Sequence, residues 1–200
     1  MTICNLSGRC AFLVAAFSVG IAFAAATPPT TQPTPAVSED GITIYFNPED
    51  GAEGAIVDHI NAAKQSVDVQ CFHFTAEPLA AALIAAKGRG VNVRMIIDAK
   101  AVLEPKCKVA ELIAKDIPVY VDSNYHTAHN KIMIFDGADV LTGSYNYTPQ
   151  SAEENAENAV FIVGKPEIAA AYVKNFLFHL GESTHITTAP APSKAAKADD

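Results

Sequence analysis

One short stretch of the sequence, residues 127–148, gathers side chains that could bind and attack a phosphate group. It reads TAHNKIMIFDGADVLTGSYNYT, and its polar residues follow the spacing HxK(x)4D(x)6GSxN. The six specified positions are His129, Lys131, Asp136, Gly143, Ser144 and Asn146. At usages of about 5% per residue type, a chance match to all six is rarer than roughly one in 10⁵ chains of this length.

Two apolar runs inside this stretch, KIMIF and DVLTG, predict a pair of neighbouring strands. Because side chains alternate between the two faces of a strand, His129 and Lys131 should point the same way. Ser144 and Asn146 should form a second pair of this kind on the other strand. The two strands would then place an imidazole, an ammonium and two neutral hydrogen-bonding groups around one anion.

Two further motif positions suggest backbone roles. Asp136 and Gly137 form a strong hairpin turn signal, and aspartate is favoured at turns for its own hydrogen bonding. We therefore expect a structural role for Asp136. Gly143 is expected to keep the backbone accessible beside the anion.

Three residues outside the spacing are weaker candidates. Glu157 stands in the acidic run EENAEN, which could instead be a solvated loop. His73, in CFHFTAEP, falls at a predicted strand end bordering the site, where it is either a substrate contact or a satisfied core histidine. His126 lies just ahead of the motif and is another candidate substrate contact.

Hydrophobic periodicity along the chain predicts the elements that must position these residues. Strands and helices alternate first, and a run of strands follows before a closing helix, which indicates an α/β fold with a mixed β-sheet flanked by helices. The expected strands are 42–47, 67–74, 91–98, 117–122, 129–137, 138–146 and 158–164. The expected helices are 54–66, 75–90, 107–116 and 165–181.

The first 26 residues predict a secretory signal peptide. They hold a single charge, Arg9, followed by a long apolar run and small residues suited to cleavage after Ala26 or, nearly as well, after Ala24. The apolar run of about 16 residues is short for a retained membrane anchor, which is the alternative. We therefore expect an exported protein, periplasmic or secreted.

Composition divides the rest of the chain. Residues 27–38 are rich in proline and threonine and predict an extended linker, and residues 183–200 predict a low-complexity tail. The folded domain is therefore expected at 39–182. Cys71 and Cys107 would remain after cleavage; an exported protein could oxidise them to a disulfide, but a buried free thiol is normal in an apolar run.

The net charge of −8 argues against a general electrostatic attraction to nucleic acid or anionic lipid. Any polyanion site must be a local basic pocket. Besides Lys131, the local basic clusters are KGRG at 87–90 and the lysines Lys100, Lys106 and Lys108. If the loop carrying these three lysines borders the site, they could guide a phosphate backbone.

The motif and the flanking sequence resemble the phospholipase D superfamily, whose HKD motif the stretch reproduces. The resemblance extends to FTAEPLAAALIAAKGRGVNVRMIID, IPVYVDS and EENAENAVFIV, and it covers residues 45 to 180. Together with the secretion signal and the single motif, these segments are most similar to small exported bacterial endonucleases of the Nuc type. The resemblance implies the phospholipase D-like α-β-α sandwich.

The resemblance also implies roles for five residues. His129 Nε2 would attack phosphorus to give a phosphohistidine, while Lys131 and Asn146 would hold the nonbridging oxygens and stabilise the developing charge. Ser144 would orient the site. Glu157 would accept a hydrogen bond from His129 Nδ1 and fix the tautomer.

A single motif has a further consequence within this family. The reaction needs both a nucleophile and an acid for the leaving oxygen, and one histidine cannot serve in both places at once. The resemblance therefore implies a symmetric homodimer in which the two copies of His129 meet across the two-fold axis. It implies no metal and no other cofactor.

The expected activity is that of a metal-independent phosphodiesterase, a nuclease of little sequence preference for which DNA is the favoured substrate and RNA a possible one. A phospholipase D acting on lipid head groups is the alternative, because the same fold serves both. No amphipathic basic stretch or aromatic wedge suits a membrane surface, which disfavours it. A catalytically idle phosphate-binding module is a third class, and the intact set of His129, Lys131, Ser144 and Asn146 argues against it.

Overall fold

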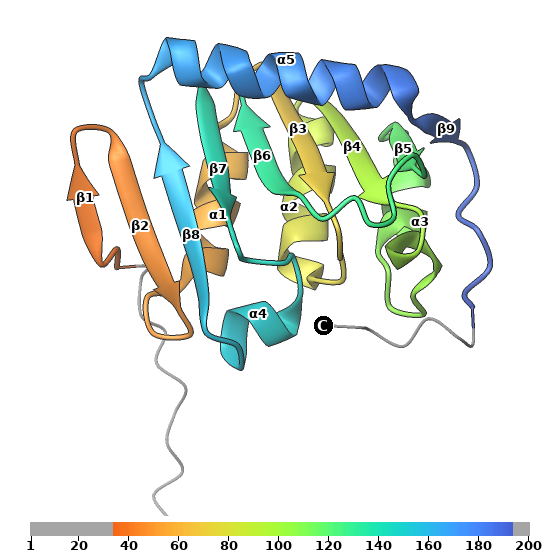
Figure 1. Ribbon diagram of the computed structural model, residues 1–200, viewed down its shortest axis with the longest axis horizontal. Helices are drawn as coiled ribbons and strands as arrows, with labels where there is room; N and C mark the ends of the chain where they lie inside the picture. Colours follow the sequence, from red (N-terminus) through yellow and green to blue (C-terminus); the bar gives the residue numbers. More distant parts are fainter. Residues whose placement is uncertain (1–33, 194–200) are drawn as a thin grey trace, which may run out of the picture. The chain divides into compact units, whose positions relative to one another are not determined.

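The computed structural model describes residues 34–193, and it confirms the predicted α/β fold (Figure 1). The expected signal peptide, with its cleavage positions at Ala24 and Ala26, lies outside the described residues. Among residues 34–193, none of the helices has the length and apolar character needed to cross a membrane. Each strand and helix expected from periodicity is present; the strand at 42–47 has the expected bounds, and the others differ at one or both ends.

Within the described residues the chain forms a sheet of nine strands, five α-helices and one 3₁₀ helix. The strands are β1 Val37–Glu39, β2 Ile42–Asn47, β3 Ser66–Cys71, β4 Asn92–Asp98, β5 Val119–Asp122, β6 Lys131–Phe135, β7 Asp139–Gly143, β8 Glu157–Ile162 and β9 Thr184–Ile186. The helices are α1 Ala52–Ala62, α2 Glu77–Gly88, η1 Ala101–Leu103, α3 Val109–Ile113, α4 Pro149–Glu153 and α5 Pro166–Glu182.

The sheet is mixed, in the order β1-β2-β8-β7-β6-β3-β4-β5-β9. β3, β4 and β5 run parallel to one another, connected through α2 and α3, and the remaining neighbours pair antiparallel. β6 therefore lies at the centre, between β3 and β7. This position makes the start of β6 a fixed point to which neighbouring strands can bring further side chains.

Apolar side chains cover both faces of the sheet. α1 and α2 lie behind the strands, and α5 runs across their other face (Figure 1). The larger core includes Ile56, Leu83, Val69, Met95 and Met133. The smaller core, beneath α5, consists of Ile96, Ile132, Ile134 and Phe176. Alternate residues of β6 thus enter different cores, which explains why its sequence is apolar throughout.

The expected domain limits, 39–182, are too narrow at both ends. β1 begins inside the expected linker and pairs with β2, and β9 begins inside the expected tail and pairs with β5. Both are edge strands of three residues with largely exposed side chains. Their stability comes from backbone pairing, so they lack the apolar alternation by which a strand is recognised in sequence.

The turn between β6 and β7 is held by the carboxylate of Asp136. Its oxygens accept hydrogen bonds from the backbone N–H groups of Lys64, Gln65 and Ser66, at 2.6 to 3.1 Å. The N–H of Asp136 in turn donates to Ser66 O at 2.8 Å. Burial alone would raise the pKa of this carboxyl, but the hydrogen bonds, led by that from Ser66, lower it below its ordinary value. Asp136 therefore ties the hairpin to the start of β3.

We predict that Asp136→Ala lowers the free energy of unfolding by about 1–3 kcal/mol at neutral pH, because three backbone donors lose a charged acceptor. A lowered pKa stabilises the fold above the unfolded-state value near 3.9, and this contribution is lost as pH falls through the folded-state pKa. The difference from the wild type should therefore shrink below about pH 4. Urea unfolding at several pH values measures it.

Asp139→Ala is the matched control, since Asp139 on the same hairpin accepts one backbone hydrogen bond, from Gly164. It should cost less than Asp136→Ala at neutral pH. Equal losses for the two variants, or a difference that does not depend on pH, would contradict the role assigned to Asp136.

Candidate active site

A cavity of about 470 Å³ lies where β6 begins and β7 ends. It brings together the five side chains for which a catalytic role is expected. Its lining consists of Phe72, His73, His129, Lys131, Gly143, Ser144, Asn146, Asn155 and Glu157. Four of these, His73, Phe72, Asn155 and Glu157, come from outside the motif and from other strands or loops.

Lys131 is the first residue of β6, and His129 precedes the strand rather than belonging to it. The Lys131 side chain is buried, with 7% of its surface exposed. Its Nζ lies 3.0 Å from each ring nitrogen of His129 and 3.2 Å from the His129 carbonyl oxygen. Because an ammonium can only donate, the ring accepts this hydrogen bond as a neutral imidazole.

Phe72 forms the apolar wall beside this pair. Its ring centroid lies 4.9 Å from that of His129 and 5.5 Å from Lys131 Nζ, so the ammonium sits over an aromatic face. Phe72 lies within a run of buried residues, 67–74, that leads out of β3. The sequence reasoning missed it, because a phenylalanine in an apolar run carries no signal of a site.

Burial sets the protonation of both motif residues. It lowers the pKa of Lys131 to about 8, against the opposing influence of Glu157 and Cys71. Burial also lowers the pKa of His129, assisted by the positive charge of Lys131 and by His73, with Asp98 opposing. At neutral pH the site therefore holds an uncharged imidazole next to a largely protonated ammonium.

Ser144 and Asn146 lie beyond the end of β7, yet their side chains still alternate with buried ones. Tyr145 and Tyr147 are 2% and 1% exposed and anchor the segment in the core, and Tyr147 bridges to Phe74. The intervening Ser144 and Asn146 consequently face the cavity. The expected orientation is correct, although core anchors rather than a strand ladder produce it.

Gly143 lines the cavity and also has a structural role in the sheet. Its φ is +148°, and a Cβ atom at this position would lie 2.2 Å from the carbonyl oxygen of Asn158. The glycine is therefore required for the close approach of β7 to β8. That approach brings Ser144 beside the carboxylate of Glu157.

Glu157 lines the cavity, but its carboxylate has partners other than the one expected. Ser144 Oγ donates to Oε2 at 2.5 Å, while Ser151 Oγ and Asn155 Nδ2 approach Oε1 at 3.3 and 3.4 Å. A hydrogen bond from His129 Nδ1 is not among the contacts of the described residues. The register of β7 and β8 pairs Gly143 with Ala159 and brings Asn158 opposite Ser144, and Glu157, the next residue along, lies within reach of the Ser144 hydroxyl.

His73 and His126, the two weaker candidates, lie in different surroundings. His73 is 4% exposed, lines the cavity and contacts Glu104, with 2.6 Å between Nδ1 and Oε1. His126 is exposed in the loop before the motif, and it lines neither this cavity nor the one beside it. Sequence reasoning missed Glu104, which is far from His73 along the chain.

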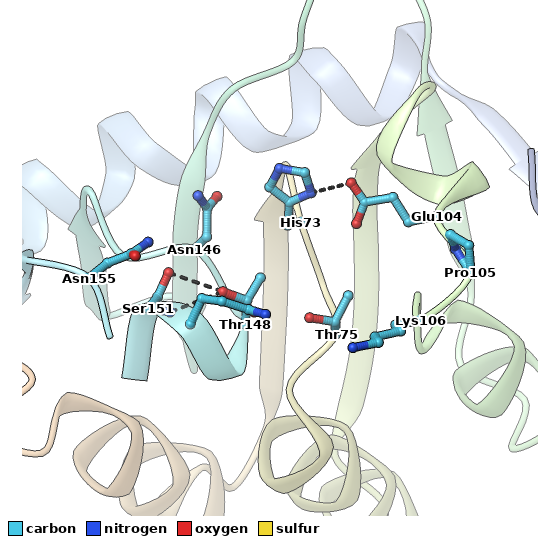
Figure 2. A pocket seen from close by; sticks show the side chains of 10 residues that line it. His73, Thr75, Glu104, Pro105, Lys106, Asn146, Thr148, Ser151 and Asn155 are labelled. Carbon is cyan, nitrogen blue, oxygen red and sulfur yellow. Dashed lines mark hydrogen bonds and ion pairs between the residues drawn. The ribbon is translucent and has the colours of Figure 1, made fainter. Parts of the chain in front are cut away.

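The basic loop after β4 borders the site through one residue. Lys106 lines an adjoining cavity of about 270 Å³, shown in Figure 2. Lys108 is held in ion pairs with Glu77 and Glu111 and lines neither cavity. Lys100 is likewise absent from both linings. Only Lys106, of these three, lies where it could contact a substrate.

Cys71 and Cys107 are free thiols and do not form the disulfide that an exported protein could make. Cys71 is fully buried, and its thiol points to the carbonyl oxygen of Ile96. Burial raises the pKa of Cys71 well above its ordinary value and that of Cys107 to about 11. Within residues 34–193, no three or more His, Cys, Asp and Glu side chains are grouped to hold a metal ion.

The chain is similar in sequence to a described protein family and to several known proteins. Residues 56–179 match the family described as "Cardiolipin synthase, PLD-like domain". A Rickettsia bellii protein named "Phospholipase D" is 33% identical over 141 residues, 70% of each chain. The mitochondrial cardiolipin hydrolase of Xenopus laevis is 32% identical over 127 residues, 64% of this chain and 60% of that protein.

The fold is similar to that of a solved structure. Nuc from Salmonella typhimurium, described as a phospholipase D family member, is 30% identical with a TM-score of 0.71. The similarity covers 74% of this chain and 98% of Nuc. NucT from Helicobacter pylori has a TM-score of 0.66 at 18% identity, a likeness of fold alone.

Proposed function

Because this chain belongs to the phospholipase D superfamily and is a phosphodiesterase of that family, we propose that it hydrolyses nucleic acid through a phosphohistidine at a site shared by two subunits. The observation that carries the proposal is the neutral imidazole of His129 held 3.0 Å from the buried ammonium of Lys131. A nucleophile and an anion-binding cation thus line one cavity.

In the first step His129 attacks phosphorus, a bond from the ring nitrogen to phosphorus forms, and the bond from phosphorus to the leaving oxygen breaks. Lys131 and the amide of Asn146 hold the nonbridging oxygens, whose negative charge grows in the transition state. The leaving oxygen takes a proton from a second histidine, which enters the step as an imidazolium and leaves it neutral, so that the two histidines of the centre hold one proton between them. Water then attacks phosphorus, gives its proton to that same histidine, and releases His129.

We propose that the second histidine is His129 of a partner subunit. Its place must be opposite the attacking nitrogen, in line with the breaking bond. His73 lines the same cavity as His129, but its Nδ1 is engaged by Glu104, and His126 lines neither cavity, so we assign the proton donor to neither of them. One motif per chain thus favours a two-fold assembly around one composite centre.

Nucleic acid is favoured over phospholipid by the surroundings of the cavity. Large exposed apolar side chains among the described residues include Phe46, Leu177 and Phe178, and none of those exposed groups lines the cavity. A surface that binds lipid usually presents apolar side chains beside the reactive site. Lys106 offers instead a cation next to the phosphate position. Phosphatidyl head groups remain the alternative substrate.

A substrate panel tests the proposed activity. With excess EDTA, the purified protein should cleave plasmid DNA faster than RNA, and either faster than phosphatidylcholine vesicles, because no step is assigned to a metal. His129→Ala and Lys131→Ala should each reduce cleavage by at least about 10³-fold while circular dichroism stays unchanged. Activity lost on chelation and restored by Mg²⁺, or full activity of His129→Ala, would refute the mechanism.

The pKa of Lys131 predicts the pH dependence. The ammonium must be protonated to hold the phosphate, so kcat/KM for bis(4-nitrophenyl) phosphate should fall as pH rises through about 8. His129 must be neutral to attack, so kcat/KM should also fall in acid. Because the pKa of His129 is lowered, that fall should occur below about pH 6.5. Arginine keeps its charge at high pH, so in the slower Lys131→Arg variant the fall of kcat/KM above about pH 8 should disappear. If kcat/KM still falls near pH 8 in Lys131→Arg, a group other than Lys131 causes the fall.

Mixing subunits tests the shared site. Wild-type protein refolded with an excess of His129→Ala subunits should lose activity per wild-type subunit, because most wild-type chains then face a partner without the histidine. Independent sites would leave that specific activity constant. Asp139→Ala subunits serve as the control for mixing itself. Full activity from a monomer in analytical ultracentrifugation would equally contradict the composite centre.

A further inference from the structure

The cavity of about 270 Å³ beside the His129 cavity has no role in the steps above (Figure 2). His73, Asn146 and Asn155 line both cavities, which therefore share a wall. A phosphate held by His129 and Lys131 would have one of its two ester groups next to this wall. The second cavity is thus placed to receive a substituent of the phosphate.

The side chains of this second cavity are polar but balanced in charge. Its two side chains of permanent charge at neutral pH, Glu104 and Lys106, carry opposite signs. The remainder, apart from His73 and Pro105, are hydroxyl and amide groups: Thr75, Asn146, Thr148, Gln150, Ser151 and Asn155. Phenylalanine, tyrosine and tryptophan are absent from this lining, so it does not form the aromatic cage that recognises quaternary ammonium groups.

The His73–Glu104 contact fixes one ring nitrogen and leaves the other for a ligand. His73 Nδ1 lies 2.6 Å from the Glu104 carboxylate, which orients the imidazole as carboxylates do for functional histidines. In Figure 2 His73 lies between Glu104 and Asn146. Its Nε2 has no hydrogen-bond partner among residues 34–193, although the side chain is 4% exposed.

Asn146 supplies an independent indication of a ligand. Its Oδ1 is buried and has no hydrogen-bond donor among the described residues. A buried carbonyl oxygen without a donor is costly, and such atoms in native proteins usually bind water or a ligand. A donor arriving in either cavity would satisfy this oxygen.

Resting on the phosphodiesterase activity proposed above, we propose that the second cavity binds the uncharged, hydroxyl-bearing group of the substrate diester, such as a sugar or a polyol, and disfavours a quaternary ammonium group. A hydroxyl can donate to Asn146 Oδ1 or His73 Nε2 and accept from Lys106 or the lining hydroxyls. A nucleoside and a glycerol head group share this chemistry. Choline lacks a donor and is repelled by Lys106.

His73 has a second effect in this arrangement, since its ring occupies one oxygen of the Glu104 carboxylate. Removing the ring would leave that oxygen facing the cavity without its partner, and an uncompensated carboxylate attracts a cation. We therefore expect loss of His73 to have opposite effects on the two kinds of substituent. Loss of His73 weakens binding of the hydroxyl-bearing group and improves that of choline.

Four esters with the same 4-nitrophenolate leaving group test this: the 4-nitrophenyl phosphate esters of thymidine, glycerol and choline, and bis(4-nitrophenyl) phosphate as the reference. Each kcat/KM is divided by that of the reference in the same variant, so that general losses cancel. In the wild type the ratio for the thymidine or the glycerol ester should exceed that for choline by about tenfold, the effect of one hydrogen bond. Whichever of the two is larger identifies the source of the group.

In His73→Ala the thymidine and glycerol ratios should fall by about tenfold and the choline ratio should rise. The added substitution Glu104→Gln should abolish that rise. His73→Gln keeps a donor for Glu104, so its choline ratio should stay low. This variant replaces His73→Ala if thermal unfolding shows that the alanine variant does not fold. His185→Ala, at an exposed histidine on β9, is the control.

Unchanged ratios in His73→Ala, or a choline ratio that is highest in the wild type, would overturn the proposed subsite. This result is distinct from failure of the proposed function, which would appear as hydrolysis of bis(4-nitrophenyl) phosphate that does not depend on His129.

Discussion

The chemistry depends on one buried ammonium placed against one imidazole. Lys131 is 7% exposed, and Nζ lies within 3.2 Å of three polar atoms, all on His129: the two ring nitrogens and the carbonyl oxygen. Removing a cation from water is costly, and burial accordingly brings its pKa down to about 8. The ammonium is thus held by few protein groups, and an incoming phosphate provides the counter-charge that it lacks. The same burial keeps His129 uncharged and nucleophilic.

The rest of the domain holds this pair in place. β6 lies in the middle of the sheet, with its alternate residues packed into different cores, so Lys131 cannot shift without disturbing both. Asp136 pins the far end of the strand to the backbone at the start of β3. At the near end Gly143 lets β7 approach β8, which brings Glu157 into the cavity opposite the cation. The carboxylate of Glu157 partly offsets the burial of Lys131.

Periodicity and motif spacing predict the central part of this arrangement and fail where distant segments meet. The apolar runs of β6 and β7 and the turn at Asp136 are local signals, and they place His129 and Ser144 near one another. The edge strands β1 and β9 are three residues long and have no apolar alternation; both are held mainly by backbone pairing, and of β9 only Ile186 packs against the larger core. The partners of Glu157 follow from strand register, and the contact between His73 and Glu104 joins two loops. Neither the partners of Glu157 nor the His73–Glu104 contact can be recognised from a pattern in the local sequence.

If His129 is the nucleophile, its imidazole becomes bonded to phosphorus during turnover, and this covalent intermediate can be trapped. Protein mixed with bis(4-nitrophenyl) phosphate is quenched in alkali within the burst of nitrophenolate release, digested, and mapped by mass spectrometry. We expect a 4-nitrophenyl phosphoryl group on the peptide that carries His129, bonded to an imidazole nitrogen. The same group should be absent from His129→Ala. A burst without this adduct, or an adduct on another residue, would contradict it.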